Sequence, residues 1–280
     1  MNRTIKPKKH LGQNFLVDGR IIRRIVDAVS PRPEDAIVEI GPGEGSLTVP
    51  LVERAGLVVA LEIDRRLVEH LRERIQKENF LLIEADALQI DWSDLLGQAV
   101  ESLKRLRPQT DPHVRVVANL PYYISTPVIE KLIKAGRPIE DMTLMLQKEV
   151  VERITSRPGS KEYGYLSVLV HLYSKATRLF DVPPSAFRPA PKVWSSIVRL
   201  EVRRRPAIDV DDEERFLAVV RAAFAQRRKT VANNLKAAAG ALAIDREIEA
   251  VFDRAGIDPR RRTETLSLDE FAELYRALYF

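Results

Sequence analysis

The sequence predicts an α/β protein in which a doubly wound, mostly parallel sheet is followed by a small all-helical domain. Seven short apolar runs with strand character recur between residues 37 and 202, and helical patterns separate most of them. After residue 203 only helical patterns remain. With 280 residues, 45% of them hydrophobic, the chain is long enough for a full α/β core and an extra module.

The first 30 residues predict a basic arm, residues 1–18, followed by a helix. They hold seven basic and two acidic residues, whereas residues 31–203 hold 24 of each and residues 204–280 hold 14 of each. The whole net charge of +5 therefore lies in this segment. A basic arm suits the phosphate backbone of a nucleic acid, although a charge run is more often only a solvated surface. Apolar residues then recur at helical spacing, at Ile21, Ile22, Ile25, Val26 and Val29.

The next segment joins a buried strand to a glycine-rich loop and a helix. The apolar run 36–40 leads into the loop 41–45, Gly-Pro-Gly-Glu-Gly, and the pattern after it is helical. Glycines let a backbone approach a ligand closely, and the helix N-terminus offers N–H groups to it. This arrangement is typical of a nucleotide-cofactor site, although the spacing is G-x-G-x-G and not G-x-G-x-x-G.

Polar residues end the following strands of the predicted sheet. The run 58–62 ends in Glu62, whose carboxylate can accept both hydroxyls of a ribose. The run 80–83 is followed by Asp86, which can accept from an adenine amino group, and the run 114–118 is followed by Asn119. Because the carboxyl ends of parallel strands meet at one edge, these residues should line one crevice with the glycine loop.

The charge around the glycine loop favours S-adenosylmethionine over NAD as the cofactor. Glu39 and Glu44 beside the loop would repel a pyrophosphate but tolerate the positive charge of a sulfonium. The motif context therefore favours a methyltransferase over a dehydrogenase.

The tetrapeptide Asn119-Leu120-Pro121-Tyr122 resembles the Asn/Asp-Pro-Pro-Tyr/Phe signature of amine methylation. The exocyclic amine of a base is a poor nucleophile because its lone pair is delocalised into the ring. The Asn119 side-chain oxygen and the Leu120 carbonyl can accept its hydrogens, Pro121 fixes the backbone, and Tyr122 can stack on the base. The alternative is an ordinary strand-to-helix turn with a buried tyrosine.

Later runs near 142–146, 177–182 and 194–202 complete the predicted sheet, and a proline-rich loop joins the last two. Phe187 in this loop is a candidate second aromatic face for a flipped base, or alternatively a hydrophobic plug under the loop. Arg188 and Lys192 would then meet phosphate. After a linker at 203–209, four helices are predicted, at roughly 212–224, 228–239, 246–255 and 267–278.

Five segments occur in the order found in the ribosomal RNA adenine N6-dimethyltransferase family of bacterial small-subunit type, which the chain resembles over nearly its whole length. They are KKHLGQNFLVD (8–18), EIGPGEGSLT (39–48), NLPYYIST (119–126), FRPAPKVWSSIVRL (187–200) and FAQRRKTVANNL (224–235). The resemblance implies the Rossmann-like fold of class I S-adenosylmethionine-dependent methyltransferases, with seven strands of which the last is antiparallel. It places a catalytic domain at 1–203 and a helical RNA-binding domain at 204–280.

The same resemblance implies dimethylation of two adjacent adenines in the 3′-terminal hairpin loop of 16S rRNA, within the small ribosomal subunit or its precursor, and a role in subunit biogenesis. S-adenosylhomocysteine would be the product of each transfer. The implied cofactor-binding residues are Asn14, Leu16, Gly41, Gly43, Glu62, Asp86 and Asn119. The basic residues expected to bind RNA are Lys8, Lys9, Arg188, Lys192, Arg227, Arg228 and Lys229. Tyr123 stands where the bacterial pattern often has Asn.

Two alternative functions remain open from the sequence. One is a related methyltransferase with another substrate, either 23S rRNA, as in antibiotic resistance, or a protein glutamine. The other is a ribosome assembly or binding factor with little catalysis. The absence of cysteine excludes disulfides and thiolate metal sites, and the four histidines lack ligand spacing, so no metal is expected. Without an apolar run of 18 residues or a signal peptide, we expect a cytoplasmic protein with no membrane partner, and the family expectation is a monomer.

Overall fold

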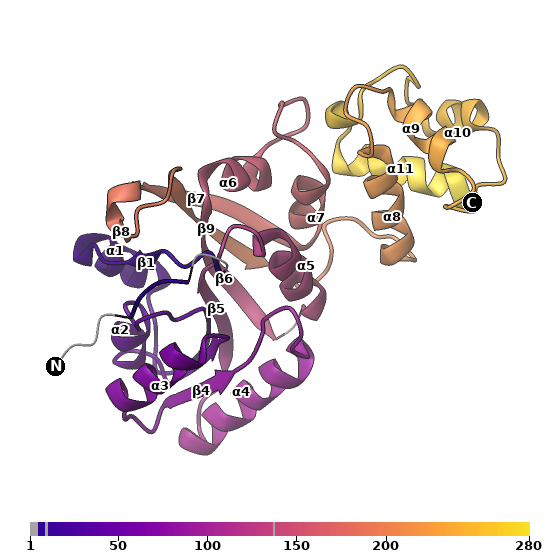
Figure 1. Cartoon of the computed structure of the whole chain (residues 1–280). Helices are drawn as coiled ribbons and strands as arrows, with labels where there is room; N and C mark the ends of the chain where they lie inside the picture. The colour runs from indigo at the N-terminus through magenta and orange to yellow at the C-terminus, as the bar shows by residue number, and fades with distance from the viewer. Residues whose placement is uncertain (1–4, 9–10, 137) are drawn as a thin grey trace. The chain divides into compact units, whose positions relative to one another are not determined.

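The computed structural model describes residues 5–8, 11–136 and 138–280, which form two compact units (Figure 1). The first unit contains the residues up to Val151 together with Lys175–Val202. The second contains Glu152–Ser174 and Arg203–Phe280. Residues 152–174 therefore cluster with the C-terminal helices and not with the sheet.

A seven-stranded sheet in the order β4-β3-β2-β5-β6-β9-β7 forms the centre of the first unit. Strands β4, β3, β2, β5 and β6 pair in parallel, and β9 runs antiparallel to β6. The predicted doubly wound sheet with an antiparallel last strand is thus confirmed. The strands are β2 (Asp35–Ile40), β3 (Leu57–Glu62), β4 (Phe80–Glu84), β5 (His113–Asn119), β6 (Ile139–Gln147), β7 (Ser174–Val182) and β9 (Ser195–Val202).

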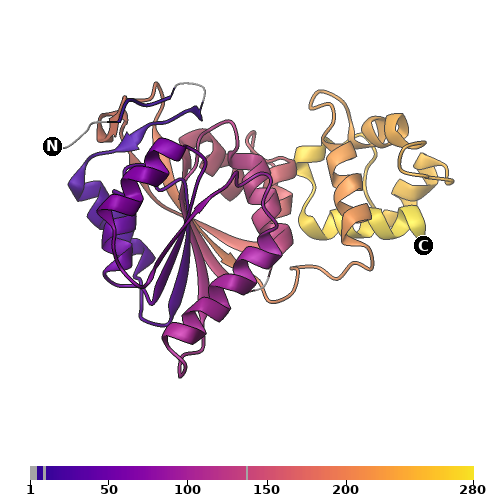
Figure 2. The same ribbon diagram turned by 60° about the horizontal axis from the view of Figure 1, so that its bottom comes forward.

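Helices cover both faces of this sheet, as Figure 2 shows. Aspartates act as N-caps of several of these helices. Asp18 accepts from the N–H groups of Arg20 and Ile21, and Asp64 accepts from that of Arg66. The helices are α1 (Gly19–Val29), α2 (Thr48–Val52), α3 (Arg65–Arg74), α4 (Trp92–Leu106), α5 (Ser125–Ala135) and α6 (Lys148–Thr155), whose last residues belong to the second unit.

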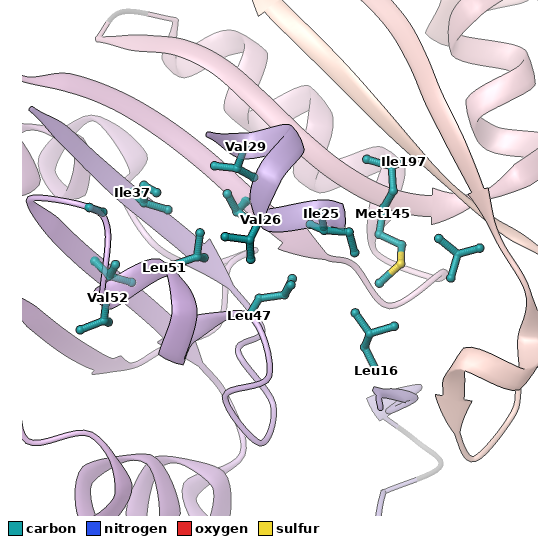
Figure 3. Close-up of a cluster of buried hydrophobic side chains, with 14 of the residues drawn as sticks. Leu16, Ile25, Val26, Val29, Ile37, Leu47, Leu51, Val52, Met145 and Ile197 are labelled. Carbon is teal, nitrogen blue, oxygen red and sulfur yellow. The ribbon is translucent and has the colours of Figure 1, made fainter. Parts of the chain in front are cut away.

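A second, two-stranded sheet joins the N-terminal arm to the proline-rich loop. Strand β1 (Phe15–Leu16) pairs antiparallel with β8 (Phe187–Arg188), which follows the short 3-10 helix η2 (Pro184–Ala186). Leu16 and Phe187 both enter the apolar cluster beneath, in which Figure 3 shows Leu16 near Met145 and Ile197. The arm is thereby held against the carboxyl edge of the large sheet by backbone pairing and apolar burial.

The second unit is helical, and its four predicted C-terminal helices are confirmed. Ser267 and Glu270 form a capping box at the start of the last one. Edge-on contacts between aromatic rings, such as Phe216 with Tyr275, fill the core of this unit. The helices are α7 (Tyr165–Tyr173), α8 (Glu213–Ala223), α9 (Val231–Ala238), α10 (Ile248–Ala255) and α11 (Leu268–Tyr279), with the 3-10 turn η3 (Thr263–Thr265) before α11.

Candidate active site

A cleft opens in the first unit where β2, β3 and β5 end and the chain leaves β4. Its lining comes from residues 11–16, 39–44, 46–47, 61–63, 67, 85–88, 119–124 and 187. Every residue that the sequence assigned to the cofactor or to the target base lies on this one cleft, and these residues come from six separate stretches of chain. A concave site with a few convergent polar groups is the usual form of a small-molecule site.

The glycine loop forms one wall of the cleft and requires its glycines. Gly41 and Gly43 have φ angles of 68° and 60°, in the left-handed region that side chains disfavour. A Cβ atom on Gly43 would lie 3.2 Å from the ring of Phe15 in the arm. The loop is held by two backbone donors, Gly41 N to Leu61 O at 2.9 Å and Gly43 N to Glu62 Oε2 at 3.3 Å.

Two buried carboxyl groups lie beside this loop. Glu62 is 5% exposed and also accepts from the N–H of Asp64 at 2.9 Å. Glu39 is 2% exposed, and among the described residues its Oε2 has no hydrogen-bond partner. Burial raises the pKa of both groups, and for Glu39, with a smaller contribution from the Glu62 charge, it raises the pKa to about 8. Burial therefore favours the protonated, neutral form of the Glu39 carboxyl group below a pH of about 8.

Asp86 lies in the loop after β4 and is half-buried. Its Oδ1 accepts from the N–H of Leu88 at 2.8 Å, which tightens the turn. The indole of Trp92 donates to the carbonyl of Ala87 at 3.1 Å and holds the same loop from α4. The carboxyl group is thus fixed at the cleft wall, next to the position expected for an adenine ring.

Asn119 is the last residue of β5, and its amide orientation is set by the arm. Its Nδ2 donates to the carbonyl of Asn14 at 3.2 Å, so the side-chain oxygen remains as an acceptor for another donor. The next residue, Leu120, is buried, and its N–H donates to Met145 O at 3.3 Å. The Asn119 side-chain oxygen and the Leu120 carbonyl are therefore two hydrogen-bond acceptors held at the end of a buried strand.

The two aromatic residues expected at the target base, Tyr122 in the turn after β5 and Phe187 in β8, differ in their surroundings. Tyr122 is half-buried, and its hydroxyl lies 3.1 Å from Ser195 Oγ at the start of β9. Phe187 lines the cleft and is only 5% exposed, because it also packs in the apolar cluster under the loop. Pro121 precedes Tyr122 in the turn after β5, where its carbonyl accepts from Ile124 N at 3.1 Å.

Asp64, the N-cap of α3, anchors the arm. Its carboxylate accepts from Lys8 Nζ at 3.0 Å, from Gln13 Nε2 at 3.1 Å and from Arg66 Nη2 at 2.7 Å. The hydrogen bonds from Arg66, Lys8 and Gln13 lower the pKa of Asp64 well below its usual range. Ser46 Oγ adds a bond to Leu16 O at 2.8 Å. These contacts hold the arm segment that completes the cleft.

The basic residues assigned to RNA fall into three groups. Lys8 is engaged with Asp64, and Lys9 lies outside the described residues. Arg188 and Lys192 are exposed in the loop between β7 and β9. In the second unit Arg227, Arg228 and Lys229 are exposed and adjoin a second basic run at 260–262, since Arg262 Nη1 donates to Arg227 O at 2.9 Å.

Among the described residues, no group of three or more histidine or acidic residues has the arrangement of a metal site. No helix within the described ranges has the length and apolar character needed to cross a membrane.

Comparisons with known proteins give one family. The family model for ribosomal RNA adenine dimethylase matches residues 4–279. A ribosomal RNA small subunit methyltransferase A of Moorella thermoacetica is 46% identical over 275 residues, covering 97% of this chain and 92% of that protein. A protein of the same name from a Geobacillus species is 45% identical and covers 97% of this chain and 91% of its own.

Two solved structures share the fold over most of the chain. A dimethyladenosine transferase from Plasmodium falciparum is 26% identical with a TM-score of 0.73, covering 93% of this chain and 95% of its own. The 23S rRNA methyltransferase ErmE is 27% identical with a TM-score of 0.68, covering 95% of this chain and 99% of its own.

Proposed function

The chain belongs to the ribosomal RNA adenine dimethylase family, and from this premise we propose that it uses S-adenosylmethionine to dimethylate N6 of two adjacent adenines in the 3′-terminal hairpin loop of 16S rRNA. The observation that carries the proposal is the convergence of Asn119–Tyr122, the glycine loop, Glu62 and Asp86 on one cleft. A role in small-subunit biogenesis follows from this substrate.

The residues of the cleft fit S-adenosylmethionine. Gly41 and Gly43 let the backbone approach the ligand, Glu62 suits the ribose hydroxyls, and Asp86 suits the adenine amino group. The acidic side chains of Glu44 and Asp86 at the cleft fit the positive charge of the cofactor better than they fit a pyrophosphate. Asn14, Leu16 and Asn119 would complete the binding surface from the arm and from β5.

When bound, S-adenosylmethionine would supply a methyl group on a cationic sulfur. The lone pair of the adenine N6 would attack the methyl carbon as the carbon–sulfur bond breaks, S-adenosylhomocysteine would leave, and N6 would lose one proton to solvent. Asn119 Oδ1 and the Leu120 carbonyl accept the N6 hydrogens and stabilise the positive charge that develops on N6. These acceptors are preorganised because the Asn119 amide is already bonded to Asn14. After the first transfer only one N6 hydrogen remains, so one acceptor becomes dispensable. No metal ion enters this scheme, since displacement at a sulfonium methyl requires no Lewis acid.

The target base must leave its stack to reach this cleft, and Tyr122 and Phe187 would sandwich it. Arg188 and Lys192 would contact phosphates near the cleft, and Lys8 and Lys9 would do so from the arm. The cluster at 227–229 would contact RNA from the second unit. We expect the protein to act as a monomer in the cytoplasm, where precursors of the small ribosomal subunit are its partners.

A direct test incubates the protein and labelled S-adenosylmethionine with undermethylated small subunits, with large subunits, and with naked RNA of each kind. The curated relatives named for the small subunit favour label in small-subunit RNA, whereas the similarity to ErmE makes the large-subunit alternative worth including. Label only in 23S rRNA or only in protein would overturn the proposal. Binding to small subunits without label would favour an assembly factor.

A further inference from the structure

One of the two tryptophans of the chain is exposed beside the cleft. Trp92 is buried at 5% exposure and bonded to Ala87, but Trp194 is 50% exposed. Tyr123 is even more exposed, at 62%. Tyr123 lines the cleft and Trp194 does not, and neither residue has a role in the proposed chemistry, because the target base is taken by Tyr122 and Phe187.

The two exposed rings are linked to the site through their neighbours in sequence. Tyr122 and Ser195 are in hydrogen-bond contact at 3.1 Å, and Tyr123 and Trp194 are the residues next to them. Ser195 pairs with Gln147 at the end of β6, so Trp194 lies at the carboxyl edge of the sheet, where the cleft opens. Both rings therefore lie near the path by which a nucleotide would reach Tyr122.

The backbone at both positions is held in place. The carbonyl of Trp194 accepts from Lys148 N at 2.9 Å, immediately after β6. Tyr123 lies in the turn closed by the bond from Ile124 N to Pro121 O, and its ring is within 3.5 Å of the position that a Cβ on Gly12 would occupy. A stacking surface on a fixed backbone loses little conformational freedom when a base binds.

The charge around Trp194 fits a nucleic acid better than an apolar peptide. Arg188 and Lys192 are exposed in the same loop, within six residues of Trp194 in sequence. Exposed aromatic rings beside basic side chains are the combination by which proteins bind single-stranded nucleic acid, since the rings stack on bases and the cations meet phosphates.

We infer that Trp194 and Tyr123 form a second stacking surface, at the exposed rim of the cleft, for unpaired bases of the RNA loop next to the adenine being methylated. The inference rests on the proposed function and names a positioning role that acts on substrate binding, not on the chemical step. With two adjacent target adenines, such a surface would hold one base while its neighbour occupies the cleft.

The test uses the full chain carrying Trp92→Phe, so that Trp194 is the only tryptophan. An RNA hairpin with two adjacent loop adenines is added, and acrylamide quenching of the Trp194 fluorescence is measured. We expect the RNA to shield Trp194 from the quencher. A hairpin with abasic sites beside the target adenine should shield it less.

Steady-state kinetics of RNA methylation give an independent test, in the protein that retains Trp92. Trp194→Ala should raise the KM for RNA by roughly 5- to 150-fold, as expected for one lost base–aromatic stack, with kcat and cofactor affinity nearly unchanged. Trp194→Phe should restore most of the loss. Leu106→Ala, which removes a 42% exposed side chain at the end of α4, is the matched control and should have no effect.

Suppose that the wild-type protein methylates RNA normally. If Trp194 is then not shielded by RNA and the KM of Trp194→Ala is unchanged, the inference is refuted and the proposed function remains intact. Shielding by small subunits but not by the hairpin, with an unchanged KM on the hairpin, would also refute base stacking and assign the ring to a ribosomal protein. Failure of the wild-type protein to methylate any RNA would instead refute the proposed function itself.

Discussion

Asn119 uses its two amide atoms for different tasks. The nitrogen donates to Asn14 O, and this bond directs the oxygen as an acceptor. At this scale the sequence is informative, because a polar residue after a buried parallel strand must lie at the carboxyl edge. Asn119, Glu62 and Asp86 are therefore predictable from their positions alone.

Replacing Asn119 by Ala should lower kcat by about 10²- to 10³-fold, the usual effect of removing one preorganised group from a site of developing charge. The KM for RNA should change only a few-fold, because base stacking and phosphate contacts remain. Steady-state methyl transfer to undermethylated small subunits measures both constants. A parallel loss of subunit binding would contradict a mainly catalytic role for Asn119.

Glu39 should make the stability of the cofactor-free protein depend on pH. Its pKa is about 8 in the folded protein against a usual value of 4.5, so between these pH values the folded state holds a proton that the unfolded state has lost. Stability should therefore fall as pH rises through this range, by at most about 1.4 kcal/mol per pH unit. Chemical unfolding from pH 5 to 8 measures the slope, and Glu39→Gln should flatten it. Equal slopes in the two proteins would contradict the assignment.

Other residue contacts could not be read from the sequence. Lys8 and Asp64 are 56 positions apart, and Tyr122 and Ser195 are 73 apart. Their side chains meet only because the sheet and the small β1–β8 sheet bring distant segments together. An aspartate before a helical pattern is typical of an N-cap, but such a pattern contains no information about the bonds of Asp64 to Lys8 and Gln13.

The position of the N-terminal arm at the cleft depends on one residue, Asp64, which bonds to Lys8 and Gln13. Asp64→Asn should weaken cofactor binding by roughly 5- to 30-fold, because charge-assisted bonds from Lys8 and Arg66 are lost and residues 11–16 are no longer held at the cleft. Titration calorimetry measures the affinity, and limited proteolysis reports release of the arm.

The matched control for this variant is Asp91→Asn. Asp91 is also an N-cap aspartate, bonded to the N–H groups of Ser93 and Asp94, but it makes no contact with the arm. Asparagine caps a helix about as well as aspartate, so neither variant should lose much capping energy. Equal cofactor affinities in the two variants would show that the arm does not depend on Asp64.

Helices and strands whose apolar residues repeat at regular spacing could be predicted from the sequence, and those without such a repeat could not. The four C-terminal helices have amphipathic patterns and cap residues, as at Ser267. Helix α7 lacks such a pattern, because most of its residues are buried on every side. Strands β1 and β8 are two residues each, too short to show alternation, so the pairing of the arm with the proline-rich loop could not be predicted.

At the scale of the whole molecule, the balanced net charge of the C-terminal segment conceals a local cluster of cations. Arg227, Arg228 and Lys229 adjoin the run 260–262 through the bond from Arg262 to Arg227 and the bridge between Thr230 and Arg262. The basic runs 227–229 and 260–262 can each be seen in the sequence, but only the fold shows that they lie next to each other.

Arg228→Ala/Lys229→Ala should weaken binding to small subunits and reduce the steepness of its salt dependence by about 1.4–1.8 in log–log slope, if each cation meets one phosphate. Lys236→Ala/Arg246→Ala removes the same charge from exposed positions outside the cluster and should leave the slope unchanged. Binding measured across a series of salt concentrations distinguishes them. Identical slopes in the two double variants would exclude the cluster from the RNA interface.

The most direct test of the central claim is mass spectrometry of small-subunit RNA after reaction with S-adenosylmethionine. We expect the wild-type protein to form N6,N6-dimethyladenosine at two adjacent positions of the 3′-terminal hairpin loop. With Asn119→Ala the amount of this product should be strongly reduced. Methylation at another base, another ring position or another RNA would contradict it.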